Sequence, residues 1–214
     1  LGHLERAQGE AVELALGPDD GAAADHFRLA RIVGRLRDGA LRGARLAATM
    51  LALAAKRVPG VPLHEADMRS FSLDRTFDAV LCLFGMIGYL RDQAEMTTAL
   101  RQMHKHLVPR GVLLLEPWLS LETAENGHLR ADTAERAGME VSRMNYTRVI
   151  GNKSLINIHY LIGDEHGVRH TEDLREMTLF TEQEYRGALR DAGFGDVALE
   201  AYGPQGRGLY IAQA

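Results

Sequence analysis

Two largely apolar runs mark the middle of the chain, at residues 77–84, where Asp78 is the one polar residue, and at residues 112–115. Both are rich in strand-forming residues and alternate little, which is typical of strands buried on both faces. Between them, an Asp92-x-x-Glu95 capping box precedes apolar positions from Met96 to Leu107 at helical spacing, and Pro109-Arg-Gly111 is expected to end that helix. Strand, helix and strand joined by short connections predict a parallel α/β sheet.

From about residue 140 the pattern changes to alternation of polar and apolar residues. Three extended segments, at about 140–149, 154–162 and 168–180, are separated by glycine-containing turns. This arrangement predicts antiparallel hairpins. Because they lie between the parallel core and its last helix, we predict that they form an antiparallel insertion at about 140–180 on one α/β core.

The chain ends with a helix and two short extended segments. Thr181-x-x-Glu184 is a second capping box, and Gly193 is expected to stop the helix that it opens. The segments at about 195–202 and 208–213 have the composition of strands.

The first 60 residues carry the weakest pattern. Residues 29–36 and 46–58 are expected to be helices, and no segment has the pattern of a first strand. The chain also begins with Leu1 rather than Met. We therefore expect residues 1–60 to be a divergent or partial N-terminal part of the α/β core, and 61–214 to be the core itself.

Composition narrows the class of protein. The 214 residues are 46% hydrophobic and carry a formal net charge of −4, which suits one globular domain and gives no sequence-wide attraction for nucleic acid. No apolar run is long enough for a membrane span, and no signal peptide opens the chain, so we expect a cytoplasmic protein without a membrane partner. The one cysteine, Cys82, is expected to be a buried apolar residue.

Seven short motifs follow one another in register along the last two thirds of the chain. They are Ala66-Asp-Met-Arg-Ser-Phe71, Phe84-x-x-Ile-Gly-Tyr-Leu90, Val112-Leu-Leu-Leu-Glu-Pro-Trp118, Ser142-Arg143, Ile158-His-Tyr160, Met177-Thr-Leu-Phe180 and Gly203-Pro-x-Gly-Arg-Gly-Leu209. This series resembles the TDP-aminosugar N,N-dimethyltransferases of desosamine and mycaminose type, which are class I S-adenosylmethionine-dependent methyltransferases. The resemblance implies a Rossmann-like α/β sheet, S-adenosyl-L-methionine as cofactor, and N-methylation of a nucleotide-linked aminosugar in antibiotic biosynthesis.

The resemblance also implies a set of cofactor-binding residues. Asp67 would accept a hydrogen bond from the adenine amine, with the Met68 backbone nearby and Leu83 against the cofactor. Gly2 is the candidate remnant of the glycine-rich loop. For Asp67 the alternative is a turn or cap residue, and for Leu83 core packing is compatible with cofactor contact.

On the acceptor side, the resemblance implies that Tyr89 faces the amine, as a catalytic residue that orients it or accepts its proton. Trp118 would line the pocket, Arg207 between two glycines would bind the pyrophosphate, and Arg143 and Tyr146 would contact the nucleotide-sugar. The alternatives are simple packing for Tyr89 and Trp118 and a surface turn for Arg207. The nine histidines show no metal-ligand spacing, so no metal is expected.

One departure from the family pattern leaves other functions open. The glycine-rich loop of the type Asp-x-x-x-Gly-x-Gly is not found before Asp67, and the acid expected to bind the ribose would be Ala15 or Arg45. Neither side chain accepts those hydrogen bonds. A non-catalytic binding module with this fold and a methyltransferase for another small acceptor are therefore the alternatives. A homodimer is compatible with the sequence, which does not specify the sugar or the number of methyl groups.

Overall fold

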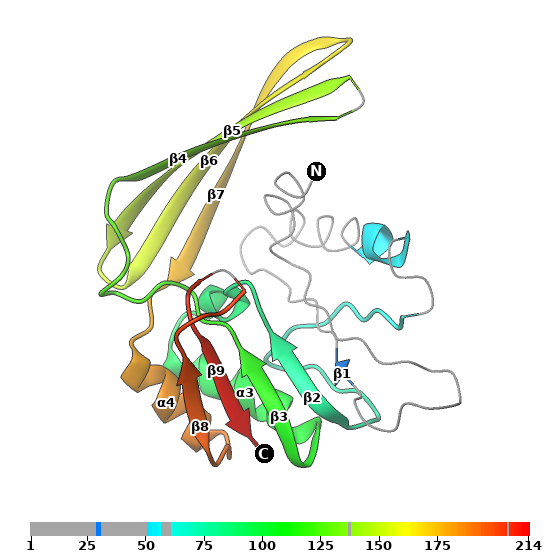
Figure 1. The fold of residues 1–214 in the computed structure, drawn as a ribbon, viewed down its shortest axis with the longest axis vertical. Helices are drawn as coiled ribbons and strands as arrows, with labels where there is room; N and C mark the ends of the chain where they lie inside the picture. The colour runs from blue at the N-terminus through cyan, green and yellow to red at the C-terminus, as the bar shows by residue number, and fades with distance from the viewer. Residues whose placement is uncertain (1–28, 31–50, 57–60, 137, 205) are drawn as a thin grey trace.

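The computed structural model describes residues 29–30, 51–56, 61–136, 138–204 and 206–214 as two β-sheets with helices (Figure 1). The first sheet has the strand order β1-β2-β3-β9-β8, and the second has the order β4-β5-β6-β7. The Rossmann-like α/β sheet with an antiparallel insertion is thereby confirmed. No helix within these ranges is long and apolar enough to cross a membrane.

The first sheet combines parallel and antiparallel pairs. Strands β1, β2 and β3 run parallel, whereas β9 runs antiparallel to both β3 and β8. Its strands are β1 (Leu29–Ala30), β2 (Phe77–Cys82), β3 (Leu107–Leu115), β8 (Val197–Glu200) and β9 (Leu209–Gln213). The parallel pair β2–β3 is the arrangement that the two apolar runs predict.

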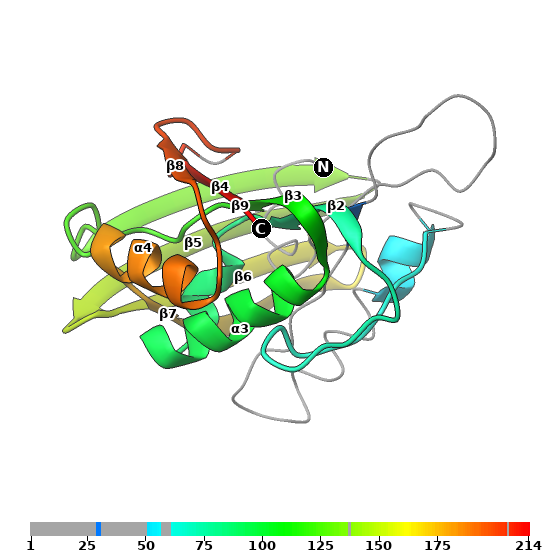
Figure 2. The ribbon, with the colours of Figure 1, turned by 90° about the horizontal axis from the view of Figure 1, so that it is seen from below.

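Two helices, α3 (Gln93–Lys105) and α4 (Glu182–Asp191), cover the same face of this sheet (Figure 2). Both begin as the capping motifs predict: the side chains of Asp92 and Thr181 accept hydrogen bonds from the third residue of each helix. Their apolar faces are buried against the sheet in a core that includes Met96, Leu100 and Leu189. Burial of each such side chain stabilises the fold by about 1.5–3 kcal/mol.

Helix α3 ends four residues before the proline expected to stop it. The following strand β3 already begins at Leu107, and Arg110 adopts a left-handed backbone conformation with φ of 67°. A 3-10 helix, η1 (Met86–Tyr89), joins β2 to α3. Gly193, with φ of 105°, follows α4 as expected.

The second sheet is an antiparallel meander of four strands: β4 (His128–Arg136), β5 (Met139–Ile150), β6 (Lys153–Asp164) and β7 (Gly167–Thr178). The last three are the predicted hairpin strands, and β4 was not predicted. Figure 1 shows this sheet standing beyond the ends toward which β2 and β3 point. It therefore lies on the side where parallel α/β sheets place their ligands.

The N-terminal expectations are partly wrong. Leu29 and Ala30, expected in a helix, instead pair in parallel with Ala79 and Val80 of β2. Residues 51–56, within the expected helix at 46–58, are helical. Residues 61–66, directly before Asp67, contain an isolated bridge at Glu65 and no strand. Gly2, Ala15 and Arg45 lie outside the described residues.

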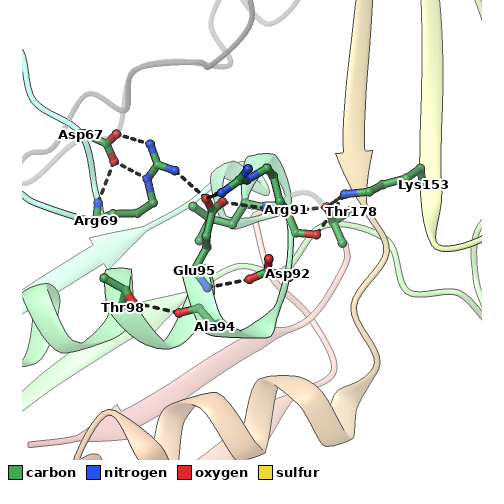
Figure 3. A network of polar contacts seen from close by, with 10 residues as sticks. Asp67, Arg69, Arg91, Asp92, Ala94, Glu95, Thr98, Lys153 and Thr178 are labelled. Atoms are coloured by element: carbon green, nitrogen blue, oxygen red, sulfur yellow. Dashed lines mark hydrogen bonds and ion pairs between the residues drawn. The ribbon is translucent and has the colours of Figure 1, made fainter.

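A polar network ties the Asp67 segment to the start of α3 (Figure 3). Arg69 donates to the Asp67 carboxylate from its backbone N and from Nε, each at 2.9 Å, and from Nη1 to Glu95 Oε1 at 2.7 Å. Arg91 Nε also donates to Glu95, at 2.8 Å. Burial disfavours the Glu95 charge, but these hydrogen bonds outweigh it and lower the pKa of Glu95 to about 2.

The same corner is joined to the second sheet. Lys153 Nζ donates to the Arg91 carbonyl at 3.1 Å and to Thr178 Oγ1 at 2.7 Å, and Thr178 Oγ1 donates to the Leu90 carbonyl. The loop after η1 is thus fixed to β6 and β7 by hydrogen bonds as well as by packing.

The network predicts an acid-sensitive contribution to stability. Because the Glu95 pKa falls from 4.5 to about 2 on folding, its contribution is complete above pH 4.5 and is lost as the pH falls toward 2. We expect Glu95→Gln to lower the free energy of unfolding by up to about 3 kcal/mol at pH 6 and by little near pH 2. Urea denaturation of both proteins across this range measures the difference. The control is Glu135→Gln, on the exposed edge of β4, and a gap independent of pH would contradict the assignment.

Candidate active site

Three loops meet at the carboxyl edge of the parallel strands. One follows β2 at residues 83–90, the second follows β3 at 116–118, and the third precedes β9 at 203–208. The third reaches the same edge because β9 is antiparallel to β3 and Tyr210 pairs with Leu115. Side chains from all three loops therefore converge on one side of the sheet.

A fully buried carboxylate, that of Glu116, connects the three loops. Its Oε2 accepts a hydrogen bond from the Phe84 backbone N at 2.6 Å and lies 3.8 Å from Arg207 Nη2. Phe84 and Gly85 both take left-handed backbone conformations, with φ of 59° and 71°. The turn after β2 is held in this strained form because the buried carboxylate binds its amide.

Trp118 lies between the first loop and the second sheet. A Cβ added at Gly85 or at Gly88 would come within 2.7 Å of Trp118, so both glycines are required for this close approach. On its other side the indole packs with Tyr89 against a cluster formed by Ile156, Ile158 and Met177. Trp118 thus lines the junction between the two sheets, as a pocket wall would.

Arg207 is held over the Trp118 ring, with its guanidinium carbon 4.8 Å from the ring centroid. Its side chain is only 16% exposed, and burial lowers its pKa, which shows that the charge is poorly solvated. The contact with Glu116 is long, and Arg207 Nε has no hydrogen-bond partner among the described residues. A guanidinium in this state has donors available for an anion.

Arg207 lines a half-open groove of about 580 Å³. Its lining includes the aromatic side chains of Trp118 and Tyr185 and the carboxylates of Glu122, Glu182 and Glu200. Arg207 is the positively charged residue of this lining, and its binding of a phosphate group stays a prediction.

Tyr89, in η1, presents a buried hydroxyl that has no hydrogen-bond partner in the described part of the chain. Burial raises its pKa well above the usual range, and the negative charge of Asp173 and the phenol of Tyr160 add to this effect. The phenol is therefore protonated at neutral pH and can donate a hydrogen bond or accept one.

The face of the second sheet that looks toward Tyr89 is polar in its middle. Arg143 and Tyr160 are cross-strand partners, and Asp173 pairs with Arg175 through a 2.8 Å hydrogen bond from Nε. Arg175 is 12% exposed, and burial lowers its pKa. Tyr146, three residues after Arg143 on β5, lies on the opposite face of the sheet and is 44% exposed. The structure does not bring Tyr146 together with the other predicted substrate-binding residues.

The predicted cofactor residues lie near the same edge. Asp67 is bonded to Arg69, which contacts the first turn of α3, and Met68 is buried in the core. Leu83 directly follows β2 and is half-buried. Their contacts with a cofactor stay predictions.

Four residues of this region were not singled out from the sequence: Glu116, Tyr160, Asp173 and Arg175. A signal for Glu116 exists, because a carboxylate directly after a fully apolar strand is costly unless it has a partner. Asp173 and Arg175 alternate with exposed residues along β7 and so resemble ordinary polar strand positions. Only the pairing of β7 with β6 places them opposite the site.

The close packing at Gly88 predicts a substitution effect that Trp118, the only tryptophan, reports directly. In Gly88→Ala the new Cβ would lie 2.7 Å from Trp118 Cβ and 3.1 Å from Met177 Cε. We expect a destabilisation of about 1–3 kcal/mol and a red-shifted indole emission. The matched control is Gly163→Ala, whose Cβ would meet neighbours at 3.8 Å or more. Unchanged fluorescence and stability in Gly88→Ala would show that the Trp118 position is not fixed by this contact.

Comparison with known proteins places this site in context. A family model described as "Methyltransferase domain" matches residues 21–111. The dTDP-3-amino-3,6-dideoxy-alpha-D-glucopyranose N,N-dimethyltransferase of Streptomyces fradiae is 41% identical over 173 residues, which cover 80% of this chain and 68% of the relative. The dTDP-3-amino-3,4,6-trideoxy-alpha-D-glucopyranose N,N-dimethyltransferase of Streptomyces venezuelae is 39% identical over 174 residues, with 81% and 73% covered.

Solved structures agree with this assignment. S-adenosylmethionine-bound CalS10, an amino pentose methyltransferase from Micromonospora echinaspora, matches with a TM-score of 0.71 and 40% identity, covering 78% of this chain and 70% of its own. DesVI of Streptomyces venezuelae matches with a TM-score of 0.73 and 39% identity, with 76% and 69% covered. The chain therefore belongs to the TDP-aminosugar N,N-dimethyltransferase family, as the seven motifs indicate.

Proposed function

We propose that this protein transfers methyl groups from S-adenosyl-L-methionine to the amino group of a TDP-linked aminosugar, as a step of antibiotic deoxysugar biosynthesis. The observation that carries the proposal is the buried, incompletely paired Arg207 beside Trp118, at the carboxyl edge of a methyltransferase sheet. The relatives are named as N,N-dimethyltransferases of dTDP-aminosugars, and two methylations of one amine are proposed here as well.

We propose that residues at the carboxyl edge of β2 bind the cofactor. Gly85 lies so close to Trp118 that a Cβ there would come within 2.7 Å of the ring, and this contact fixes the loop that follows β2. Leu83 would contact the cofactor there, and Asp67, whose orientation is fixed by Arg69, would accept the hydrogen bond of the adenine amine with the Met68 backbone alongside. When bound, S-adenosylmethionine supplies a methyl group already activated by the sulfonium.

On the acceptor side, the chain itself has to bind and align a neutral amine. The Tyr89 hydroxyl would accept a hydrogen bond from that amine, or donate one to a sugar hydroxyl. Its raised pKa favours the orienting role over that of a proton acceptor, because a phenolate in this environment is disfavoured. Asp173, which is paired with Arg175, places negative charge next to Tyr89 and so also disfavours a phenolate there.

Arg207 would bind the pyrophosphate of the nucleotide. A guanidinium can contact two phosphate oxygens at once. Glu116, 3.8 Å away, balances the positive charge of Arg207 only in part, and the negative charge of the pyrophosphate would complete the balance. Arg143, on the inner face of the second sheet, would contact the nucleotide-sugar from above. Tyr146 is on the outer face, so we no longer assign it to this contact.

The second sheet would cover the bound sugar. We propose that the antiparallel insertion at about 140–180 is the substrate-binding part and that Trp118 forms the wall between the sugar and the core.

A cytoplasmic homodimer is proposed for the assembly, and sedimentation of the purified protein measures its size.

Arg207→Ala separates the two ligands. We expect the affinity for the TDP-aminosugar to fall at least tenfold, because a charge-assisted contact with phosphate is worth about 1.5–3 kcal/mol, while the affinity for S-adenosylmethionine changes less than twofold. Calorimetric titration of each ligand measures both values. Arg148→Ala, on the exposed outer face of β5, is the matched control. Equal losses for both ligands would contradict a phosphate-binding role.

Tyr89→Phe tests the acceptor site. Removal of the unpartnered hydroxyl should lower kcat by about tenfold to a hundredfold, with little change in S-adenosylmethionine affinity, because alignment of the amine is lost. If the phenol orients the amine without losing its proton, the basic limb of the pH–rate profile stays the same in parent and variant. A limb that disappears in Tyr89→Phe would instead identify Tyr89 as the proton acceptor. An unchanged kcat would assign it to packing alone.

Titration with S-adenosylmethionine also decides between this proposal and a non-catalytic binding module. Saturable binding together with dimethylated product supports the enzyme. No saturable binding would contradict it and favour the module, whereas binding without turnover of any TDP-aminosugar would favour another small acceptor.

A further inference from the structure

The outer face of the second sheet carries a cluster that the proposed methyl transfer does not use. His159 on β6 lies directly opposite Glu172 on β7, and His170 lies two residues before Glu172 on the same face. Histidine nitrogens and a carboxylate oxygen here lie within 4.8 Å of one another. We propose that His159, His170 and Glu172 form a binding site for a divalent transition-metal ion, with Zn²⁺ as the best-fitting ion.

The three ligand atoms form a compact triangle. His159 Nδ1 lies 3.0 Å from His170 Nε2 and 3.5 Å from Glu172 Oε1, and His170 Nε2 lies 3.9 Å from the same oxygen. A point about 2 Å from all three atoms exists within this triangle, and Zn²⁺ binds nitrogen and carboxylate oxygen at about that distance. The side chains can therefore hold an ion without movement of the strands.

Each of the two imidazoles directs one ring nitrogen into the cluster. Their ring planes differ by 10°, and the two nitrogens face each other at 3.0 Å. Only one of the two can carry a proton in this contact, so the other offers its lone pair. A metal ion replaces that shared proton, and small rotations about the broad χ2 torsion of each histidine turn both lone pairs toward the ion.

A further side chain can fix the histidine tautomer. Nδ2 of the Asn157 side-chain amide lies 3.0 Å from Nε2 of His159, the nitrogen that faces away from the cluster. When this amide turns over, its oxygen accepts a hydrogen bond from Nε2–H of His159, which leaves Nδ1 unprotonated and free to bind metal. Such an outer hydrogen bond is usual for metal-binding histidines.

The donor set selects the class of ion. Two imidazoles and one carboxylate suit Zn²⁺, Ni²⁺, Cu²⁺ or Co²⁺ better than Ca²⁺ or Mg²⁺, which prefer oxygen. All three side chains are between 40% and 57% exposed, so the remaining positions would be filled by water. The ion would join β6 to β7 on the face opposite Tyr160 and Asp173, and so would stabilise the insertion without entering the reaction.

Spacing along the sequence does not reveal this site. The ligands are separated by 11 and 2 residues, which matches no metal motif, and they become neighbours only through the β6–β7 register.

Zinc titration of the tag-free, chelator-treated full chain tests the proposal. We expect one equivalent of Zn²⁺ to bind with a Kd on the order of micromolar, because half-exposed three-ligand sites are weaker than closed structural sites. Co²⁺ should give visible absorption bands at the same stoichiometry. Zn²⁺ should also raise the melting temperature.

Single substitutions identify the ligands. His159→Ala and His170→Ala should each weaken Zn²⁺ binding at least tenfold and abolish the melting-temperature rise, with an unchanged circular dichroism spectrum. His128→Ala is the matched control, since His128 pairs with Glu125 elsewhere on the sheet. No saturable binding by the parent protein, or equal affinity in a His159→Ala/His170→Ala double variant, would overturn the proposal. Methyl transfer by His170→Ala should equal that of the parent, and a tenfold loss would contradict a site outside the reaction.

Discussion

The hydrogen bond between the buried Glu116 carboxylate and the Phe84 amide is the contact on which the geometry of the site depends. A carboxylate that is fully buried costs several kcal/mol unless hydrogen bonds and opposite charge compensate it. Glu116 meets this requirement with an amide from the loop after β2 and a guanidinium, Arg207, from the loop before β9. The positions of both loops are therefore set by the need to solvate one charge at the end of β3.

This constraint explains the local features around it. Phe84 takes a left-handed conformation because its amide has to point at the carboxylate, and Gly85 continues the same turn without a Cβ to meet Trp118. Trp118 in turn receives the Arg207 guanidinium on its ring face. The nearest carboxylate to the buried Arg207 guanidinium is that of Glu116, at 3.8 Å. An anionic group of the substrate would therefore neutralise the remaining positive charge. The stability of the loops and the phosphate binding that we propose for Arg207 thus have the same origin.

The sequence predicted those parts of the fold that depend on near neighbours or on strong patterns. Apolar runs identified β2 and β3, and the capping boxes at Asp92 and Thr181 identified both helices. Strand β4 was missed because most of its described side chains are exposed and none of them is buried, so no apolar alternation marks it. The Leu29–Ala30 strand was missed because only its pairing with β2 defines it. Glu116 could not be assigned a role, because its partners lie 32 and 91 residues away along the chain.

The separation of Arg143 and Tyr146 follows from the period of two along a strand, which sends residues three apart to opposite faces. The same rule separates the two proposed sites on β7, where Asp173 faces Tyr89 and Glu172 faces outward. A slip of one residue would exchange the two faces, so the register has to be fixed. Gly151, with φ of 59°, fixes the β5–β6 turn, and Gly167, with φ of 116°, closes the β6–β7 hairpin. These turns therefore keep the acceptor face and the proposed metal cluster chemically independent, although they share one pair of strands.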